Sequence, residues 1–136
     1  MIHFITLGVR NIERSREFYS NLFDLKPLPE SDENVVFYDF KGLRLSLFGR
    51  AALADDAHVK DEPTGFSAVS LAHNVSSKPE VAEFLKRAEK YGAKMIKPAQ
   101  DVFWGGHSGY FKDLDGHLWE VAHNPFVTIG SDGRLK

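Results

Sequence analysis

Residues 109–125 read GYFKDLDGHLWEVAHNP, and this stretch decides the interpretation of the fold. The dipeptide Asp115-Gly116 is typical of a tight turn, and the residues after it, 117–123, have the composition of an apolar strand. Glu120 stands in the middle of that strand. A buried carboxylate is costly unless a partner satisfies it. Glu120 is therefore predicted to face a metal ion, a bound molecule or a hydrogen-bond partner.

The chain contains two copies of one predicted element order, β-α-β-β-β. In the first copy a helix is capped by Asn11 and ends near Phe23, and the strands are expected at 2–9, 25–28, 35–40 and 43–48. In the second copy the sequence SKPE, residues 77–80, predicts a capping box at the start of a helix that ends near Gly92. Its strands are expected at 65–75, 93–97, 109–112 and 117–123.

The two copies define the predicted domain organisation. The first module covers about residues 1–50 and the second about residues 65–125, separated by a polar linker, 51–64, with a short helical turn. The tail, 126–136, is expected to be loose. The final hairpin turns, at Gly42 and Gly116, correspond to each other, and the second copy is longer around residues 103–109.

Composition and charge exclude several classes of function. The chain has a net charge of -2 and no basic run, which argues against a nucleic-acid partner. It has no cysteine, so disulfides and thiolate chemistry are excluded. The apolar run at the N-terminus is far too short to span a membrane. These features predict a cytoplasmic protein without a membrane partner.

Strand alternation predicts which residues share the face of the sheet away from the helices. Leu45 and Leu47 should pack under the helix, which leaves Ser46 on the other face. A two-residue turn at Lys41-Gly42 places Phe37 opposite Ser46 and Asp39 opposite Arg44, an expected cross-strand ion pair. By the same alternation, and by counting residues across the hairpin turns, the face is predicted to include the cleft candidates Phe4, Phe37, Ser46, Ser70, His107, Phe111 and Glu120. Small residues, aromatic rings and one carboxylate together suggest a small-molecule cleft; burial against another surface is the alternative.

Three of the predicted cleft residues carry possible chemistry. Glu120 is a candidate polar anchor or general base, and His107, in the extra loop of the second copy, is a candidate acid/base partner. Trp104 can stack on a planar ligand or close the pocket. Each has a structural alternative. Glu120 could be a carboxylate satisfied by hydrogen bonds, His107 a histidine on the surface, and Trp104 an anchor for the start of its loop.

Between residues 2 and 125 the chain resembles the glyoxalase / bleomycin-resistance / extradiol-dioxygenase superfamily, the vicinal oxygen chelate fold. The paired modules carry the resemblance, together with ITLGVRNIERSREFY near the N-terminus and GYFKDLDGHLWEVAHNP near the C-terminus. It implies an α+β fold in which two βαβββ modules form a curved, open sheet around a cleft, with the helices outside. It also implies a homodimer and, in many members, a divalent metal ion.

The family's metal-ligand positions correspond here to Phe4, Ser46, Ser70 and Glu120, and only Glu120 carries a metal-binding group. We therefore expect no cofactor and a function similar to the bleomycin-resistance branch: binding of a small organic molecule in a cleft. The ligand-binding residues would be Phe4, Phe37, Ser46, Ser70, Trp104 and Phe111. The rival is a lyase, isomerase or dioxygenase with a divalent metal at Glu120, completed by His3, a partner subunit or the substrate. A protein-interaction module is the third alternative.

Overall fold

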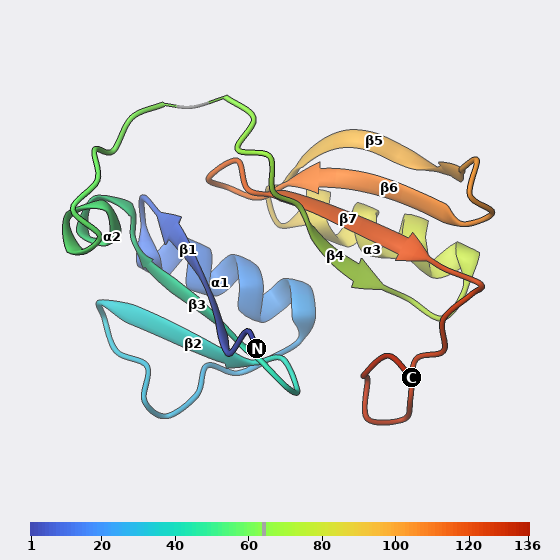
Figure 1. Ribbon diagram of the computed structural model, residues 1–136, viewed down its shortest axis with the longest axis horizontal. Coiled ribbons are helices and arrows are strands. Elements are labelled where there is room, and N and C mark those ends of the chain that lie inside the picture. The colour runs from blue at the N-terminus through green and yellow to red at the C-terminus, as the bar shows by residue number, and fades with distance from the viewer. Residues whose placement is uncertain (64) are drawn as a thin grey trace. The chain divides into compact units, whose positions relative to one another are not determined.

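The computed structural model describes residues 1–63 and 65–136, and the chain divides into two compact units (Figure 1). Unit 1 comprises Met1–Ser67 and unit 2 comprises Ala68–Lys136. Each unit contains one sheet and at least one helix packed on it, which confirms the predicted α+β class. In the part of the chain that the structure describes, no helix has the length and apolar character needed to cross a membrane.

Unit 1 has a three-stranded sheet in the order β1-β3-β2, with β1 parallel and β2 antiparallel to β3. Its elements are β1 (Phe4–Val9), α1 (Ile12–Phe23), β2 (Val35–Asp39), β3 (Arg44–Gly49) and α2 (Arg50–Asp56). The predicted start of α1 is confirmed, because the Asn11 side chain accepts a hydrogen bond from the Arg14 amide at 2.9 Å. Apolar side chains of α1, among them Phe18 and Leu22, are buried in the core.

The structure describes all of residues 25–28, and the strand expected there is absent. Two prolines, Pro27 and Pro29, flank Leu28, and proline has no amide hydrogen to donate to a ladder. Only an isolated bond remains, from the Leu28 amide to the Phe37 carbonyl at 2.8 Å. The segment therefore runs beside β2 without becoming a strand.

Unit 2 has a four-stranded sheet in the order β4-β7-β6-β5 (Figure 1). Its elements are β4 (Leu71–Asn74), α3 (Lys78–Lys90), β5 (Lys94–Asp101), β6 (His107–Lys112) and β7 (Leu118–His123). The helix α3 packs on one face, where Val81 and Leu85 are buried with Trp119 and Val121 of the sheet. We call the opposite side the helix-free face of unit 2.

Two details of unit 2 differ from the sequence predictions. The strand expected at 65–75 begins only at Leu71, because Ala68 has a φ of 59°, a left-handed conformation that a strand does not contain. At the start of α3, the Ser77 hydroxyl donates to the Glu80 carboxylate at 2.9 Å and does not cap a backbone amide. The capping box is thus replaced by a bond between the two side chains.

The C-terminal tail, which the sequence predicts to be loose, folds back on itself. Ile129 and Leu135 form an isolated antiparallel bridge, and the Gly130 amide donates to the Arg134 carbonyl at 2.7 Å. Nearby, the ends of β4 and β7 and residues 127–129 line a hollow of about 210 Å³.

Candidate functional site

A row of four residues crosses the helix-free face of unit 2. The strand registers place Glu120 of β7 between Ala72 of β4 and Tyr110 of β6, and Tyr110 beside Lys97 of β5. Directly opposed residues in neighbouring strands point to the same side of a sheet. The row therefore presents an ammonium, a phenol and a carboxylate side by side on one surface.

Glu120 and Tyr110 form a hydrogen-bonded pair in this row. The Tyr110 hydroxyl donates to Oε2 of Glu120 at 2.8 Å, and both residues are half-buried. This bond, with smaller contributions from burial and from the charge of Glu120, raises the pKa of Tyr110 above its ordinary value. The partner that Glu120 faces within unit 2 is thus a phenol.

Replacing Glu120 with glutamine should lower the pKa of Tyr110 towards its ordinary value. The substitution removes the negative charge that disfavours the tyrosinate, and it weakens the hydrogen bond that holds the phenol proton. Absorbance titration of the phenol in the native protein, with Tyr110→Phe to identify its transition, measures the shift. An unchanged transition would show that the Tyr110–Glu120 bond does not form in solution.

Two further rows flank Glu120 on the same face. On one side Lys94, Lys112 and Leu118 are aligned across β5, β6 and β7. On the other side the aligned residues are Gln100, Ser108, Ala122 and Asn74. Ser108 and Ala122 are buried, whereas Lys94, Lys112 and Gln100 are exposed. The face therefore has a buried, small-residue floor beside Glu120 and a basic edge on β5 and β6.

The prediction that Phe111 shares the face of Glu120 is wrong. Phe111 pairs with Trp119, has an exposed fraction of 0%, and stacks its ring on that tryptophan with centroids 6.2 Å apart. The turn between β6 and β7 contains five residues, 113–117, because the Asp113 side chain accepts bonds from the amides of Asp115 and His117. The prediction assumed a two-residue turn, which would pair each residue of β6 with the next residue along β7. A register shift of one residue exchanges the two faces of a strand.

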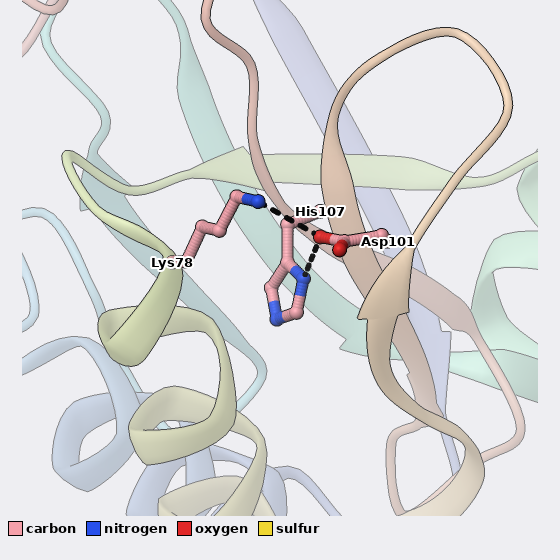
Figure 2. Close-up of polar contacts among 3 residues, drawn as sticks. All are labelled: Lys78, Asp101 and His107. Atoms are coloured by element: carbon pink, nitrogen blue, oxygen red, sulfur yellow. Dashed lines mark hydrogen bonds and ion pairs between the residues drawn. The ribbon is translucent and has the colours of Figure 1, made fainter.

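The same shift of register moves His107 to the side of α3, so its predicted partnership with Glu120 is also wrong. His107 instead donates from Nδ1 to Asp101 at 3.0 Å, and the same carboxylate oxygen accepts from Lys78 at 2.9 Å (Figure 2). The bond from Lys78, followed by that from His107, lowers the pKa of Asp101. Lys78 belongs to the first turn of α3, so this cluster ties the helix to the end of β5.

Trp104 lies in the loop between β5 and β6, where the Val102 amide donates to the Gly106 carbonyl at 3.0 Å. Its ring covers Gly106 so closely that a Cβ at this glycine would clash with the indole. The neighbouring Phe103 is exposed. Trp104 thus packs on its own loop, and its predicted contact with a ligand stays a prediction.

Unit 1 presents its own helix-free face, with the predicted residues Phe4, Phe37 and Ser46. Phe37 pairs with Ser46 as expected, and the rings of Phe4 and Phe37 meet edge to face with centroids 6.0 Å apart. The Ser46 side chain is 2% exposed and its hydroxyl is hydrogen-bonded to the Thr6 hydroxyl. This face therefore offers an aromatic pair to a ligand, whereas the Ser46 hydroxyl is already bonded to Thr6.

The remaining predicted residue, Ser70, belongs to unit 2. It is exposed and precedes β4.

A family model for the glyoxalase/bleomycin resistance protein/dioxygenase superfamily matches residues 1–121. The chain belongs to this superfamily. Membership agrees with the repeated modules and the tandem α+β units described above.

Solved structures of the glyoxalase superfamily resemble the chain to different degrees. A glyoxalase-related enzyme from Fulvimarina pelagi is 34% identical, with a TM-score of 0.90 over 100% of this chain and 96% of that one. A glyoxalase/bleomycin resistance protein/dioxygenase family enzyme from Burkholderia phytofirmans is 15% identical, with a TM-score of 0.80 over 88% and 95%. A lactoylglutathione lyase from Agrobacterium tumefaciens is 21% identical, with a TM-score of 0.68 over 91% and 93%. The last two similarities concern the fold alone.

The residues around Glu120 do not fit the divalent metal that many members of the glyoxalase superfamily bind. The strand neighbours of Glu120 are Ala72 and Tyr110, and neither supplies an imidazole or a carboxylate. Among residues 1–63 and 65–136, no three His, Cys, Asp or Glu side chains are grouped so that they could hold a metal ion. The expectation that the protein works without a metal stays a prediction.

Proposed function

We propose that this superfamily member binds a small organic molecule on the helix-free face of unit 2, with Glu120 as its polar anchor. The Tyr110–Glu120 hydrogen bond supports the proposal most directly. A carboxylate accepts several hydrogen bonds, and Tyr110 occupies only Oε2 and holds the side chain in one orientation. Oε1 is then available to a hydroxyl or amide group of a ligand.

The surroundings of Glu120 favour an organic ligand. Leu118 and Ala122 precede and follow Glu120 on the same face of β7, and the ring of Tyr110 lies alongside. Binding sites for small molecules combine such apolar surface with a few fixed polar groups. A charge-assisted hydrogen bond from the ligand to Glu120 would contribute about 1.5–3 kcal/mol.

An enzymatic reaction is the second candidate, because the 34% identical relative from Fulvimarina pelagi is described as a glyoxalase-related enzyme. The reaction classes expected from the sequence are lyase, isomerase and dioxygenase. Glu120 would then be the residue that exchanges a proton with the substrate, and Tyr110 would position it. Turnover that is abolished in Glu120→Gln would favour this candidate over binding alone.

A fragment library screened by ligand-observed NMR tests the binding proposal. We expect binders whose dissociation constants increase about tenfold or more in Glu120→Gln, since the substitution replaces a charged acceptor with a neutral one. Tyr110→Phe should weaken the same compounds less, because it removes only the group that orients Glu120.

Asp101→Asn provides the matched control. It also replaces a carboxylate of unit 2 with an amide, but on the side of the sheet that faces α3. Binders should keep their affinity in this variant. An absence of binders, or an equal loss in Asp101→Asn and Glu120→Gln, would overturn the proposal. The homodimer and the cytoplasmic location stay predictions.

A further inference from the structure

We infer that the molecule bound beside Glu120 is an organic anion with a carboxylate or phosphate group. This inference rests on the proposed binding function and specifies the class of ligand. Three lysines carry it: Lys94, Lys97 and Lys112, which the strand registers place on the helix-free face of unit 2. The sequence alone shows no such cluster, because these lysines are spread over two strands.

A β-bulge creates the cluster. The pairing of β5 with β6 shifts by one residue between Met95 and Lys97, so that Met95 is opposite Phe111 on the helix side and Lys97 is opposite Tyr110. In a regular strand these two residues would point to the same face. The bulge therefore turns Lys97 towards the phenol and Glu120.

The charge of this face is opposite in sign to that of the whole chain. The chain has a net charge of -2, yet the three aligned rows of this face contain three lysines and a single carboxylate, Glu120. Within the described residues, none of the three ammonium groups lies in an ion pair with a carboxylate. Lys94 and Lys112 are directly opposed, which is unfavourable for two like charges. An anion bound beside Lys112 would reduce that repulsion.

The arrangement also predicts how the ligand is oriented. Neighbouring strands lie about 4.8 Å apart, so the backbones at Lys97 and Glu120, two strands apart, are separated by roughly 10 Å. A molecule with one aromatic ring and a substituent at each end spans this distance. Its anionic group would meet Lys97 and Lys112, while Glu120 repels that group and accepts a hydroxyl at the other end.

Matched probes test the inference: 4-hydroxybenzoate, 4-hydroxybenzamide and 4-hydroxybenzylamine share one scaffold and differ in charge, and 4-hydroxyphenyl phosphate tests the second type of anion. We expect the anions to bind more tightly than the amide and the amine. Lys97→Gln and Lys112→Gln should each weaken the binding of 4-hydroxybenzoate about three- to tenfold, and added salt should weaken it further. A tighter complex with 4-hydroxyphenyl phosphate would assign the site to phosphate, and a tighter complex with 4-hydroxybenzoate would assign it to carboxylate.

Lys86→Gln is the control, because it removes the same charge from an exposed position on α3. Tighter binding of the amine or amide, or equal effects of Lys86→Gln and Lys97→Gln, would overturn the anion inference and leave the binding proposal intact. A lack of binding by every probe and every library compound would instead overturn the binding proposal itself.

Discussion

Replacing Phe111 with alanine is expected to lower the free energy of unfolding by about 3–5 kcal/mol, the usual cost of removing a large aromatic side chain from a core. Phe111 has an exposed fraction of 0%, and its ring is stacked on Trp119 under α3. Truncation removes this contact and leaves a cavity that the flanking strands cannot close. Urea denaturation followed by circular dichroism measures the loss.

Phe103→Ala is the matched control, since it makes the same truncation at an aromatic residue of unit 2 that is fully exposed. Its free energy of unfolding should stay within about 0.5 kcal/mol of the original value. A Phe111→Ala protein of unchanged stability but impaired ligand binding would contradict the observed register. That result would indicate that Phe111 lies on the helix-free face, as the sequence predicted.

Replacing Gly109 with alanine is expected to destabilise the protein by about 1–3 kcal/mol, because the site is already filled. A Cβ at Gly109 would lie 2.5 Å from Cδ1 of Leu85 and 2.7 Å from the carbonyl oxygen of Lys97. The leucine can rotate, but the carbonyl belongs to the backbone of β5. The bulge that orients Lys97 must therefore shift to accommodate the methyl group.

Gly49→Ala is the control for this prediction, because its added Cβ meets only the Ala52 methyl group at 3.7 Å, an ordinary contact. Thermal unfolding of both variants gives the comparison, and NMR of the Lys97 amide reports the displacement of β5. Equal melting temperatures for the two variants would show that Gly109 is not closely packed.

The first module could be predicted in detail because its signals are local. The two-residue turn Lys41-Gly42 fixes which residues of β2 and β3 are opposite each other, so Phe37 opposite Ser46 and Asp39 opposite Arg44 are both confirmed. Asn11 begins α1 as expected. Arg44 was expected to form an ion pair with Asp39, but its guanidinium instead lies 3.7 Å from the carboxylate of Glu30. Ion pairs between exposed side chains are weak, so the strand register does not determine which partner an exposed arginine contacts.

The second module could not be predicted to the same depth, because its register depends on how many residues its turn contains. The carboxylate of Asp113 accepts amide hydrogens from Asp115 and His117, and this requires a five-residue turn. The spacing of Asp113 and Gly116 is a signal for such a turn, but a two-residue turn at the same glycine fits the apolar pattern equally well. The two alternatives place Phe111 and His107 on opposite faces.

Of the residues that form the candidate site, only Glu120 could be predicted from the sequence. Glu120 stands out because a carboxylate interrupts an apolar strand, and its position on the helix-free face agrees with the prediction from alternation. Tyr110 was missed because it follows from the register of the second hairpin. Lys97 was missed because a bulge, not a regular alternation, directs it to this face.

Titration of isotope-labelled protein with 4-hydroxybenzoate, followed by NMR of the backbone amides, tests the proposed site most directly. The proposal predicts that the largest chemical-shift changes cluster at residues 108–112 and 118–122, and that Glu120→Gln requires about tenfold more ligand to produce them. Changes confined to Asp101 and His107, or to residues of unit 1, would contradict a binding site at the Tyr110–Glu120 pair.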